Sequence, residues 1–303
     1  TAPIEQLRIM IARVARSQAP VHICGESGTG KELVARLIHA GGSRAANPFV
    51  AVNCGAIPAE LMESELFGHR KGSFTGAVAD KPGLVQAAEG GTLFLDEVAD
   101  LPLPMQVKLL LIQEKAVRMV GDQRETPVDV RILSATHRDL GELVAAGKFR
   151  EDLYYRLNVI ELRVPPLREH LEDVPELVEA ILARQARQAG LPVPRLAPGV
   201  MQLLVTYRYP GNVRELENIL ERALTLSGGE EIRPEDIQLR PVAGGDLEEA
   251  EAPGGLGDQL ESLEREAIVR ALEQTRYNKN AAAKVLGITF RALRYRIKKL
   301  GIE

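Results

Sequence analysis

The sequence predicts an α/β domain with a largely parallel sheet, then a small all-helical domain, and then a second helical domain at the C-terminal end. Three observations predict this order. Short β-rich apolar runs alternate with helical stretches over the first 160 or so residues, a pattern typical of a parallel sheet with helices on its faces. From Glu169 to about Gln238 the strand signal vanishes and helical periodicity replaces it. A segment rich in glycine and acidic residues, 241–257, precedes the last helical region.

The strand candidates are short apolar runs, and helical patterns separate them. The expected strands are Val21–Cys24, Phe49–Asn53, Thr92–Leu95, Val130–Ala135 and Val159–Val164. The helices expected between them include Glu32–Ala40 and Met105–Glu114. The helical domain is expected to contain Asp173–Gln188, Pro198–Tyr207 and Val213–Leu226. We therefore assign the α/β part to residues 1–165 and the helical part to residues 166–240.

Segment 241–257, PVAGGDLEEAEAPGGLG, holds five glycines, two prolines and four acidic residues. Such a composition buries too little apolar surface to fold, so we expect a flexible linker. Beyond it, residues 258–303 begin with an amphipathic helix, because apolar side chains recur at helical spacing between 260 and 272. Two short helices follow, divided at residues 287–289. We expect this stretch to form a small all-α domain.

The composition excludes several classes of protein. Apolar residues make up 45% of the 303 residues and charged residues 26%, which is ordinary for a globular protein and excludes collagen-like, disulfide-rich and wholly disordered chains. Cys24 and Cys54 stand in apolar surroundings and are interpreted as small core residues of a reduced protein. No apolar run approaches the roughly 18 residues that span a membrane, and no signal peptide opens the chain, so we expect a cytoplasmic protein without a membrane partner. Because the chain begins at Thr1 rather than Met, we expect that it lacks an N-terminal part of its parent.

The net charge of −4 comes from 38 basic and 42 acidic residues and by itself argues against nucleic-acid binding. The charge is unevenly distributed, however. Residues 258–303 carry ten basic and six acidic side chains, a net +4, which leaves −8 for residues 1–257. The average therefore hides a cationic tail attached to an acidic remainder.

A phosphate-binding loop is indicated directly after the first strand. The run Gly25-Glu26-Ser27-Gly28-Thr29-Gly30-Lys31 fits the pattern G-x-x-x-x-G-K, between a strand and the helix that opens at Glu32. Its glycines let backbone N–H groups and the helix N-terminus face phosphates, and Lys31 adds a positive charge. Ser or Thr usually follows the lysine and holds Mg²⁺, whereas this chain has Glu32. The alternative interpretation is a glycine-rich turn without a ligand.

Two carboxylates follow another buried-type strand. Residues 92–95 end in Asp96 and Glu97, and acidic groups at the end of a hydrophobic strand are costly unless they bind a cation or take part in chemistry. Asp96 suits the binding of Mg²⁺, and Glu97 is placed to polarise an attacking water. A solvated strand end is the alternative. Together with the phosphate-binding loop, the pair predicts an ATPase site that uses ATP and Mg²⁺.

Several motifs resemble one family, in the order in which that family has them. The segments GESGTGKE, ELFGHRKGSFTGA, GGTLFLDEVADLP, FREDLYYRLNVIELRVPPLRE and YPGNVREL resemble the AAA+ domain of bacterial enhancer-binding proteins, the sigma-54-dependent transcription activators. The resemblance runs from about Pro20 to Leu239 and implies an α/β AAA+ P-loop ATPase domain with a helical lid subdomain. In that family Glu32 is the normal residue after the lysine. Tyr209 stands where the family often has Trp, which keeps an aromatic ring. Residues 76–110 further resemble the regulators of type IV pilin genes, which are response regulators of two-component systems.

The resemblance also implies roles for residues outside the two central motifs. Asn53 resembles the residue that holds the catalytic Glu97 in a switched-off pose. Thr136, with His137 beside it, resembles the first sensor of the family. Arg214 resembles the second sensor, which reaches the phosphates from the lid. These four residues are therefore expected to meet around the nucleotide with Glu97.

Two arginines of the FREDLYYR segment, Arg150 and Arg156, resemble arginine fingers. An arginine delivered to the γ-phosphate from a neighbouring subunit stabilises charge that develops in the transition state. Head-to-tail contacts of this kind close into rings, so the resemblance implies a hexamer or a heptamer. From the residues alone, the alternative is that both arginines form surface ion pairs with Glu151 and Asp152.

A glycine-rich loop follows a basic stretch. In Gly72-Ser73-Phe74-Thr75-Gly76-Ala77 two glycines bracket an aromatic residue, and glycine-rich loops rarely bury a phenylalanine well, which favours an outward Phe74. The alternative is a turn whose phenylalanine folds back into the core, which from physics alone is the more common outcome. The segment resembles the GAFTGA loop of the family, which contacts sigma-54 and promoter DNA and moves with ATP hydrolysis. Here Ser73 replaces the first alanine.

The C-terminal helices have the features of a DNA-binding unit. Asn280 is placed to cap a first short helix, Gly287 to form a left-handed turn and Thr289 to cap a second helix. Eight basic residues and no acidic ones lie between 276 and 299, the charge pattern of a phosphate-binding surface, with a solvated basic helix hairpin as the alternative. The segment resembles the Fis-type helix-turn-helix of these activators, in which the preceding helix pairs two copies on a palindromic enhancer. The candidates for base or phosphate contacts are Arg291, Arg294, Arg296 and Lys298, with Asn280 and Thr289 in support.

The sequence therefore predicts a sigma-54-dependent activator that binds enhancer DNA, assembles into a ring and uses ATP hydrolysis to remodel sigma-54 RNA polymerase. The alternative is an AAA+ and helix-turn-helix regulator that represses transcription or activates ordinary polymerase. An unrelated P-loop motor, such as a helicase or a clamp loader, is a third class. The loop at 72–77 favours the first interpretation, because the other classes lack this loop or do not need it.

Overall fold

The structure is a computed structural model of the chain and describes residues 1–228, 230–239 and 275. Residues Thr1–Pro241 form one compact unit. The expected linker at 241–257 lies outside the described residues, and so does the expected C-terminal domain at 258–303 apart from Thr275. The α/β part and the helical part that follows it are described below.

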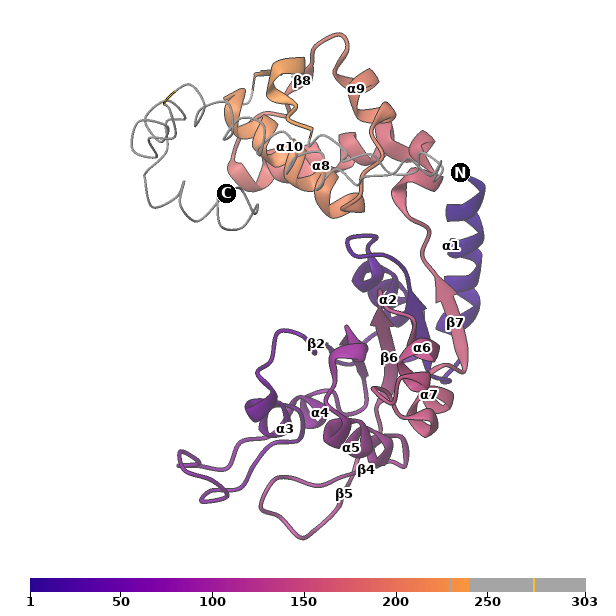
Figure 1. Cartoon of the computed structure of the whole chain (residues 1–303), viewed down its shortest axis with the longest axis vertical. Coiled ribbons are helices and arrows are strands. Elements are labelled where there is room, and N and C mark those ends of the chain that lie inside the picture. The colour runs from indigo at the N-terminus through magenta and orange to yellow at the C-terminus, as the bar shows by residue number, and fades with distance from the viewer. Residues whose placement is uncertain (229, 240–274, 276–303) are drawn as a thin grey trace. The chain divides into compact units, whose positions relative to one another are not determined.

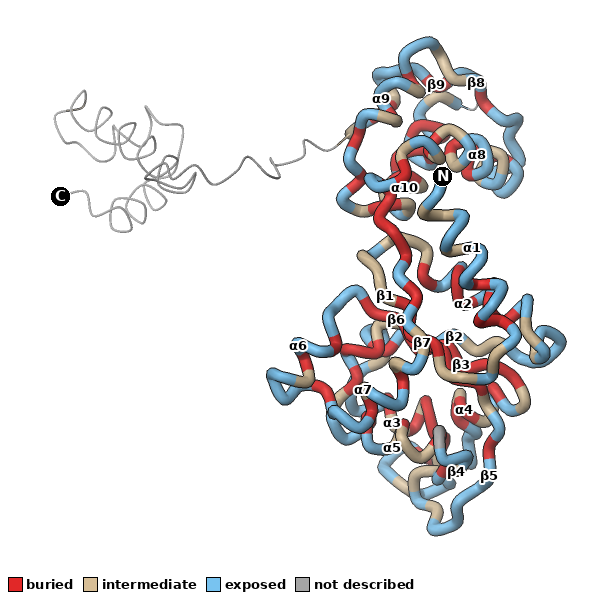
Figure 2. Tube along the Cα trace, turned by 90° about the vertical axis from the view of Figure 1, so that its right-hand side faces the viewer, coloured by how far each residue is buried: buried red, intermediate tan, exposed pale blue. Residues whose placement is uncertain are grey.

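Five parallel strands form the main sheet, in the order β2-β3-β6-β1-β7 (Figure 1). They are β1 (Val21–Cys24), β2 (Phe49–Asn53), β3 (Thr92–Asp96), β6 (Arg131–Thr136) and β7 (Ile160–Arg163). Each expected strand is present, with ends that differ by at most one residue. The central strands are buried almost throughout (Figure 2), because helices cover both faces of a parallel sheet. The predicted α/β class is confirmed.

The parallel register brings the last residues of the strands to one edge of the sheet. Cys24 at the end of β1 is in register with Thr136 at the end of β6. Asn53 at the end of β2 is in register with Asp96 at the end of β3. Ligands of parallel α/β sheets bind in the loops beyond the carboxyl ends of the strands. The functional residues expected from the sequence therefore lie at the edge where a ligand site is normally found.

Helices lie on both faces of the sheet and bury two separate apolar clusters. They are α1 (Ala2–Ala15), α2 (Lys31–Ala40), α3 (Ala59–Phe67), α4 (Leu84–Ala87), α5 (Leu103–Gln113), α6 (Leu140–Ala145) and α7 (Glu151–Leu157). Leu93 and Leu95 of β3 belong to the cluster that α3, α5 and α7 cover. Phe94 belongs to the cluster under α1 and α2. This alternation is the period-two pattern of a strand that is buried on both faces.

Two small features were not expected from the sequence, one between α5 and β6 and the other between β3 and α5. A two-residue antiparallel pair consists of β4 (Ala116–Val117) and β5 (Thr126–Pro127). A short 3-10 helix, Val98–Asp100, follows β3. Elements of two or three residues are too short to show a periodic apolar pattern, so only the fold reveals them.

The buried guanidinium of Arg131 attaches α1 to the sheet. Its Nη2 and Nη1 atoms donate to the carbonyl oxygens of Val14 (2.7 Å) and Ala15 (3.3 Å) at the end of α1. Those carbonyls carry the negative end of the helix dipole, which favours a cation there. Burial lowers the pKa of Arg131. A buried cation therefore holds the C-terminal end of α1 against the sheet.

The helical part contains α8 (Val174–Ala189), α9 (Val200–Thr206) and α10 (Asn212–Leu226), preceded by the 3-10 turns Leu167–Glu169 and Leu171–Asp173 and followed by a third, Pro234–Asp236. Tyr209 is fully buried among these helices, and its hydroxyl donates to the carbonyl oxygen of Leu204 (2.7 Å). The expectation that no strand occurs here is wrong in one detail, because β8 (Arg195–Leu196) and β9 (Glu231–Ile232) form a short parallel pair. Its two strands are too short to show a strand pattern in the sequence.

The two cysteines differ in environment. Cys54 is buried, as expected, and burial raises the pKa of its thiol to about 12. Cys24 is only half-buried, and its Sγ lies 3.4 Å from the carboxylate of Glu161, which corrects the expectation of a wholly apolar setting. Burial, with Glu161 second, raises the pKa of the Cys24 thiol to about 11.

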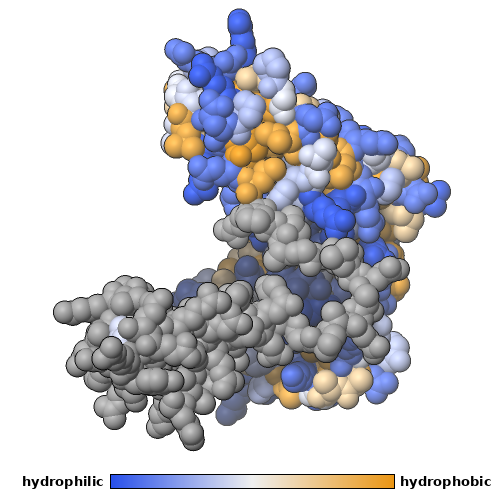
Figure 3. All heavy atoms as spheres, turned by 45° about the horizontal axis from the view of Figure 1, so that its top comes forward, coloured by the Kyte–Doolittle hydropathy of each residue, from blue (hydrophilic) through white to orange (hydrophobic). Residues whose placement is uncertain are grey.

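The described surface is mixed in polarity. On the face drawn in Figure 3, apolar side chains lie between charged and polar ones. Within the described ranges, no helix combines the length and the apolar character that crossing a membrane requires.

Candidate functional site

The phosphate-binding loop connects β1 to α2, with Gly30 as the residue that precedes the helix. Lys31 folds back over this loop, so that its Nζ donates to the carbonyl oxygens of Gly25 (2.9 Å) and Glu26 (3.0 Å). The lysine is only 6% exposed, and burial lowers its pKa. Its Nζ also lies 3.9 Å from a carboxylate oxygen of Glu97. A buried cation thus stands at the centre of the loop, facing the acidic end of β3.

Two glycines of the loop have left-handed backbone angles. Gly28 has a φ of 79° and Gly30 a φ of 92°, which glycine adopts without a steric cost. The loop is also closed by Thr29, whose hydroxyl donates to the carbonyl oxygen of Glu26 (2.9 Å). Glu32, one residue beyond the loop lysine, points to the surface and pairs with Arg36 (2.7 Å). The carboxylate of Glu32 is therefore engaged along its own helix.

At Gly28 the loop also touches the helical part. A Cβ atom added there would stand 2.3 Å from the carbonyl oxygen of Gly211. Gly28→Ala is therefore expected to lower the free energy of unfolding by an overpacking cost of about 1–3 kcal/mol in addition to the cost of its left-handed backbone. Gly147→Ala is the matched control, because Gly147 has a φ of 68° and open space around it. Denaturant titration of both variants measures the difference, and equal losses would contradict the close approach.

The acidic end of β3 lies next to the loop. Asp96 is partly buried, and burial, then the neighbouring Glu97, raises its pKa. Glu97 has the left-handed angles φ 52° and ψ 49°, a conformation that costs a residue with a Cβ about 1–2 kcal/mol and is concentrated at functional sites. Its carboxylate accepts from the hydroxyl of Thr136 (3.3 Å) and lies 2.8 Å from Nδ1 of His137. The two carboxylates expected from the sequence are thus adjacent, and both are near Lys31.

Asn53 stands at the same edge but has a different partner in this conformation. Its Oδ1 accepts from the backbone N–H of Gly55 (3.0 Å). Among the described residues, the hydrogen-bond partners of the Glu97 carboxylate are Thr136 and His137. The register places Asn53 beside Asp96, one residue from Glu97. The inactive pose that the resemblance implies for Asn53 stays a prediction.

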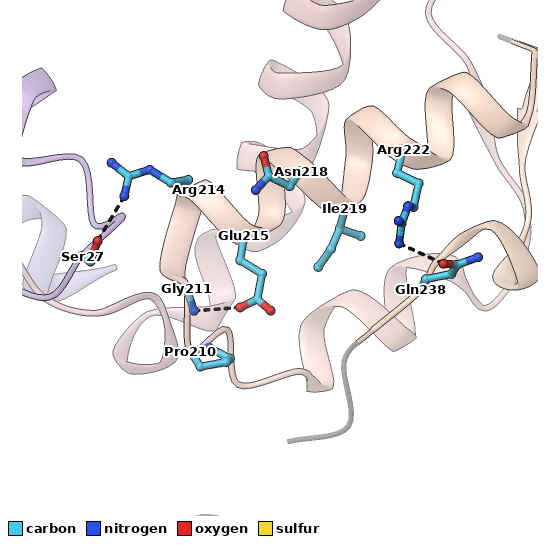
Figure 4. Close-up of a pocket in the computed structure, with 9 residues that line it drawn as sticks. All are labelled: Ser27, Pro210, Gly211, Arg214, Glu215, Asn218, Ile219, Arg222 and Gln238. Carbon is cyan, nitrogen blue, oxygen red and sulfur yellow. Dashed lines mark hydrogen bonds between the residues drawn. The ribbon is translucent and has the colours of Figure 1, made fainter. Parts of the chain in front are cut away.

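The helical part contributes Arg214 from α10. Its Nη1 donates to the hydroxyl of Ser27 in the loop (3.1 Å), and its backbone N–H donates to the carbonyl oxygen of Gly28 (3.3 Å). A pocket of about 560 Å³ opens beside this contact, lined by Ser27, Pro210, Gly211, Arg214, Glu215, Asn218, Ile219, Arg222 and Gln238. Figure 4 shows Arg214 reaching from α10 towards Ser27 while Glu215 turns back to Gly211. The pocket therefore lies between the loop and the helical part.

The sequence reasoning missed two residues of the helical part that hold the loop. Arg168 donates to both carboxylate oxygens of Glu26, at 2.8 and 2.5 Å. The buried amide of Asn212 donates to Glu26 (3.1 Å) and to the carbonyl oxygen of Ser27 (3.0 Å). Both residues lie within quoted motifs, PPLRE and GNVREL. Their place in these motifs was the one signal that could have indicated them. Their contacts with the loop could not be predicted from local sequence patterns, because the paired residues are more than 140 positions apart.

The two arginines expected as fingers form ion pairs within the chain. Arg150 pairs with Asp152 (2.7 Å), which is one of the pairs that the alternative interpretation proposed. Arg156 lies 3.6 Å from Glu114 instead of pairing with an acid of its own segment. All four side chains are about half exposed. The finger role of Arg150 and Arg156 stays a prediction.

The loop at 72–77 has a clamped neck and an exposed tip. At the neck, the backbone groups of His69 and Lys81 exchange two hydrogen bonds of 2.9 Å, and the N–H of Arg70 donates to Val120 (3.0 Å). At the tip, the side chain of Phe74 is 41% exposed and its ring lies edge-on to that of His69, 5.0 Å between centroids. Ala77 is buried. Phe74 is thus outside the apolar core, on the surface side of the loop.

The residues predicted to contact DNA all lie outside the described residues: Asn280, Thr289, Arg291, Arg294, Arg296 and Lys298. Within the described ranges, no group of three or more His, Cys, Asp or Glu side chains has the geometry of an all-protein metal site. A Mg²⁺ ion that is held jointly by one carboxylate and by phosphates needs no such group.

Comparison with protein families gives three successive matches. Residues 1–163 match the Sigma-54 interaction domain, residues 168–252 the AAA+ ATPase lid domain, and residues 259–300 the bacterial regulatory protein family named after Fis. The three matches follow the order of the α/β part, the helical part and the C-terminal region. The expected AAA+ and Fis-type fold class is thereby confirmed, and the helical part is called the lid from here on.

Curated relatives and solved structures agree with these matches. The chain is 63% identical over 305 residues to the response regulator protein PilR of Pseudomonas aeruginosa, which covers 99% of this chain and 68% of PilR. It is 50% identical over 287 residues to the transcriptional regulatory protein ZraR of Klebsiella oxytoca, covering 93% of this chain and 64% of ZraR. The chain thus spans about two thirds of the length of these relatives.

Among solved structures, NtrX from Brucella abortus superimposes with a TM-score of 0.74 at 38% identity, covering 100% of this chain and 68% of NtrX. NtrX in complex with ATP gives a TM-score of 0.73 at 36% identity, covering 100% of this chain and 69% of that chain. The family matches and these relatives lead to one assignment: the chain belongs to the family of sigma-54-dependent AAA+ transcription activators.

Proposed function

We propose that this chain binds ATP with Mg²⁺ between the phosphate-binding loop and the lid, hydrolyses it, and uses the hydrolysis to remodel sigma-54 RNA polymerase. The meeting of Lys31, Asp96, Glu97 and Thr136 at one edge of the sheet carries this proposal. Arg214 completes the arrangement from the lid side. The structures of NtrX with ADP and with ATP support nucleotide binding by this fold.

Lys31 and Asp96 would bind the phosphates and the metal ion. The Nζ of Lys31 is held by two backbone carbonyls, and phosphate oxygens are stronger acceptors for a cation. The raised pKa of Asp96 reflects burial and the adjacent Glu97, so a divalent cation next to it would favour its charged form. Mg²⁺ neutralises charge on the phosphates during transfer. Asp96 is therefore the residue proposed to hold it.

Glu97 would orient and polarise the attacking water. Its carboxylate is held near the end of β6 by contacts with Thr136 and His137. Thr136 is fully buried at the end of β6, so its hydroxyl is a fixed contact for the carboxylate. This contact supports the role of Thr136 as first sensor, because a change at Glu97 reaches β6 directly.

Arg150 and Arg156 would act on the ATP bound by a neighbouring subunit in a ring. Their present ion pairs with Asp152 and Glu114 are exposed to solvent. Exposed ion pairs are screened by solvent and contribute little to stability. Breaking these ion pairs for a contact with a γ-phosphate therefore costs little free energy. We expect both guanidinium groups to be released in the ATP-bound oligomer.

The loop at 72–77 would transmit hydrolysis to sigma-54. Phe74→Ala is expected to leave ATP hydrolysis within about twofold of the unchanged chain, because Phe74 lies outside the core and surface substitutions usually have small effects. Open-complex formation is expected to fall below about a tenth, since an exposed aromatic residue is the kind of side chain that dominates an interface. The measurement pairs an ATPase assay with a promoter-opening assay.

Val78→Ala is the control for Phe74→Ala, because Val78 is 82% exposed beside the same loop but is smaller and lies outside the proposed contact. It is expected to open promoters normally. Full activation by Phe74→Ala would contradict the proposed contact with sigma-54.

Comparison of two polymerases tests the function as a whole. With ATP and enhancer DNA present, the proposal expects open complexes with sigma-54 holoenzyme and none above background with ordinary holoenzyme. ATP-independent stimulation of ordinary holoenzyme would instead support the alternative regulator. Enhancer binding is proposed for residues 258–303, as a dimer, through the cationic segment between 276 and 299.

A further inference from the structure

The carboxylate of Glu26 lies in the phosphate-binding loop but is bound by the lid. Arg168 donates to both of its oxygens, at 2.8 and 2.5 Å, and Asn212 donates a third hydrogen bond of 3.1 Å. These contacts, with Arg168 as the largest cause, lower the pKa of Glu26 to about 2. A bidentate pair between a guanidinium and a carboxylate fixes geometry as well as distance. Glu26 is therefore charged and held in one orientation.

Asn212 ties three segments together at this point. Its Nδ2 bonds to Glu26 and to the backbone of Ser27, and its Oδ1 accepts from the N–H of Leu167 (2.9 Å). The residue is fully buried and has a left-handed φ of 52°. An asparagine that satisfies both ends of its amide in a strained backbone is held rigidly. The start of the lid at Leu167 and the start of α10 are thus both fixed to the loop.

Arg214 is two residues beyond Asn212 on α10. Its guanidinium already reaches Ser27, the neighbour of Glu26 (3.1 Å). The place of this guanidinium over the loop is consequently set by the same contacts that anchor the first turn of the helix. A loss of the anchor would let the helix, and Arg214 with it, move away from the loop.

We propose that Glu26 is a positioning residue: its carboxylate, held by Arg168 and Asn212, fixes the lid to the phosphate-binding loop and so places Arg214 for contact with the nucleotide. The proposal rests on the nucleotide site of the proposed function. It adds a role for an acidic side chain of the phosphate-binding loop, which by its charge alone would repel phosphate.

Because of this repulsion, the direction in which ATP affinity changes distinguishes two explanations. If Glu26 affected ATP only through its charge, the neutral variant Glu26→Gln would bind ATP more tightly, because a repulsive charge is removed. If Glu26 positions Arg214, the same variant binds ATP more weakly, because an amide cannot form the bidentate charge-assisted pair with Arg168. The two explanations therefore predict opposite changes from one isosteric substitution.

The experiment measures equilibrium binding of a fluorescent ATP analogue with Mg²⁺ to the full chain. We expect Glu26→Gln to weaken binding by about fivefold or more, the scale of an ordinary coupling between sites. Arg214→Ala is expected to weaken it at least as much. The double variant is expected to bind no more weakly than Arg214→Ala, because Glu26 acts through Arg214. Unchanged or tighter binding by Glu26→Gln, or a double variant whose loss is the product of the two single losses, overturns the proposal.

Two further variants are measured in the same assay, a second test variant and a matched control. Arg168→Lys keeps the charge but cannot donate in a bidentate fork, and it is expected to weaken ATP binding only when Arg214 is present. If circular dichroism shows that Glu26→Gln does not fold, Arg168→Lys replaces it as the test variant. A loss of ATP affinity by Arg168→Lys that persists when Arg214 is absent overturns the proposal. Glu231→Gln is the matched control, since Glu231 pairs with Arg233 in the lid and is exposed to a similar degree, 47% against 43% for Glu26, and its binding is expected to be unchanged.

The nucleotide site itself is checked in the same assay by Lys31→Ala. Normal ATP binding by that variant would contradict the proposed function. Loss of binding by Lys31→Ala together with additive effects of Glu26 and Arg214 would contradict only the positioning role. The two failures are therefore distinguishable.

Discussion

Lys31→Ala is expected to lower the affinity for ATP by roughly 100-fold or more, because the site loses a buried charge-assisted donor, and hydrogen bonds to charged groups contribute about 1.5–3 kcal/mol each. Lys31 is the cation that the loop itself encloses: its Nζ contacts the carbonyls of Gly25 and Glu26 and lies 3.9 Å from Glu97. Without it, residues 25–31 would offer the phosphates no positive side chain opposite Asp96 and Glu97. Titration calorimetry with ATP and Mg²⁺ measures the change.

The fold is expected to survive this substitution. Burial lowers the pKa of Lys31, so its removal relieves a desolvated cation while it gives up two hydrogen bonds to backbone. The melting temperature without nucleotide is therefore expected to stay close to that of the unchanged chain, whereas the stabilisation by ATP disappears. Lys148→Ala, at an exposed position, is the control. It should keep the normal melting temperature and the stabilisation by ATP. Retention of ATP affinity by Lys31→Ala would exclude the assigned phosphate site.

Glu97→Gln is expected to bind ATP nearly normally and to lower kcat by about 10²–10⁴-fold, the usual contribution of a positioned general base. The amide keeps the shape of the side chain and its contact with Thr136, but it cannot polarise a water by accepting its proton. The measurement is the ATP dissociation constant beside the steady-state hydrolysis rate. Because binding and turnover separate, the expected signature is a low kcat at an almost unchanged affinity.

Glu125→Gln is the control for Glu97→Gln, since it removes one carboxylate from an exposed ion pair with Arg118 (2.8 Å). It should hydrolyse ATP at the unchanged rate. Turnover by Glu97→Gln at more than about half the normal rate would refute the assignment of Glu97 as the base, and loss of ATP binding by the same variant would indicate a role in the fold of the site instead.

The sequence predicted the α/β class because its strands are long enough for the apolar pattern to show. All five strands were located to within one residue, and the strand-loop-helix context placed the loop of residues 25–31 correctly between β1 and α2. The resemblance to the enhancer-binding family then supplied roles that no local pattern contains, such as those of Thr136 and Arg214. Family membership is confirmed by the domain matches, whereas the individual roles stay predictions.

Contacts between segments that are distant along the chain could not be predicted from the sequence. The ion pair of Arg168 with Glu26 joins residues 142 positions apart, and Arg131 reaches the end of α1 across 117 positions. The two-residue pair of β8 and β9 was missed because so short an element has no period. The residues alone had suggested surface ion pairs of Arg150 and Arg156 with Glu151 and Asp152, and the structure contains the pair of Arg150 with Asp152.

By itself, the sequence determined the order along the chain of the main strands and helices, the glycine-rich G-x-x-x-x-G-K loop after β1, the acidic pair after β3 and the cationic C-terminal segment. These are local properties, set by apolar period, backbone freedom at glycine and charge along the chain. Only the tertiary structure decided which side chains meet: that Glu97 turns to Thr136 and His137, that Phe74 stays outside the core, and that the lid binds Glu26 through Arg168 and Asn212. The physical reason is that such contacts depend on how the sheet and the lid pack, and packing brings together residues that the chain itself keeps far apart.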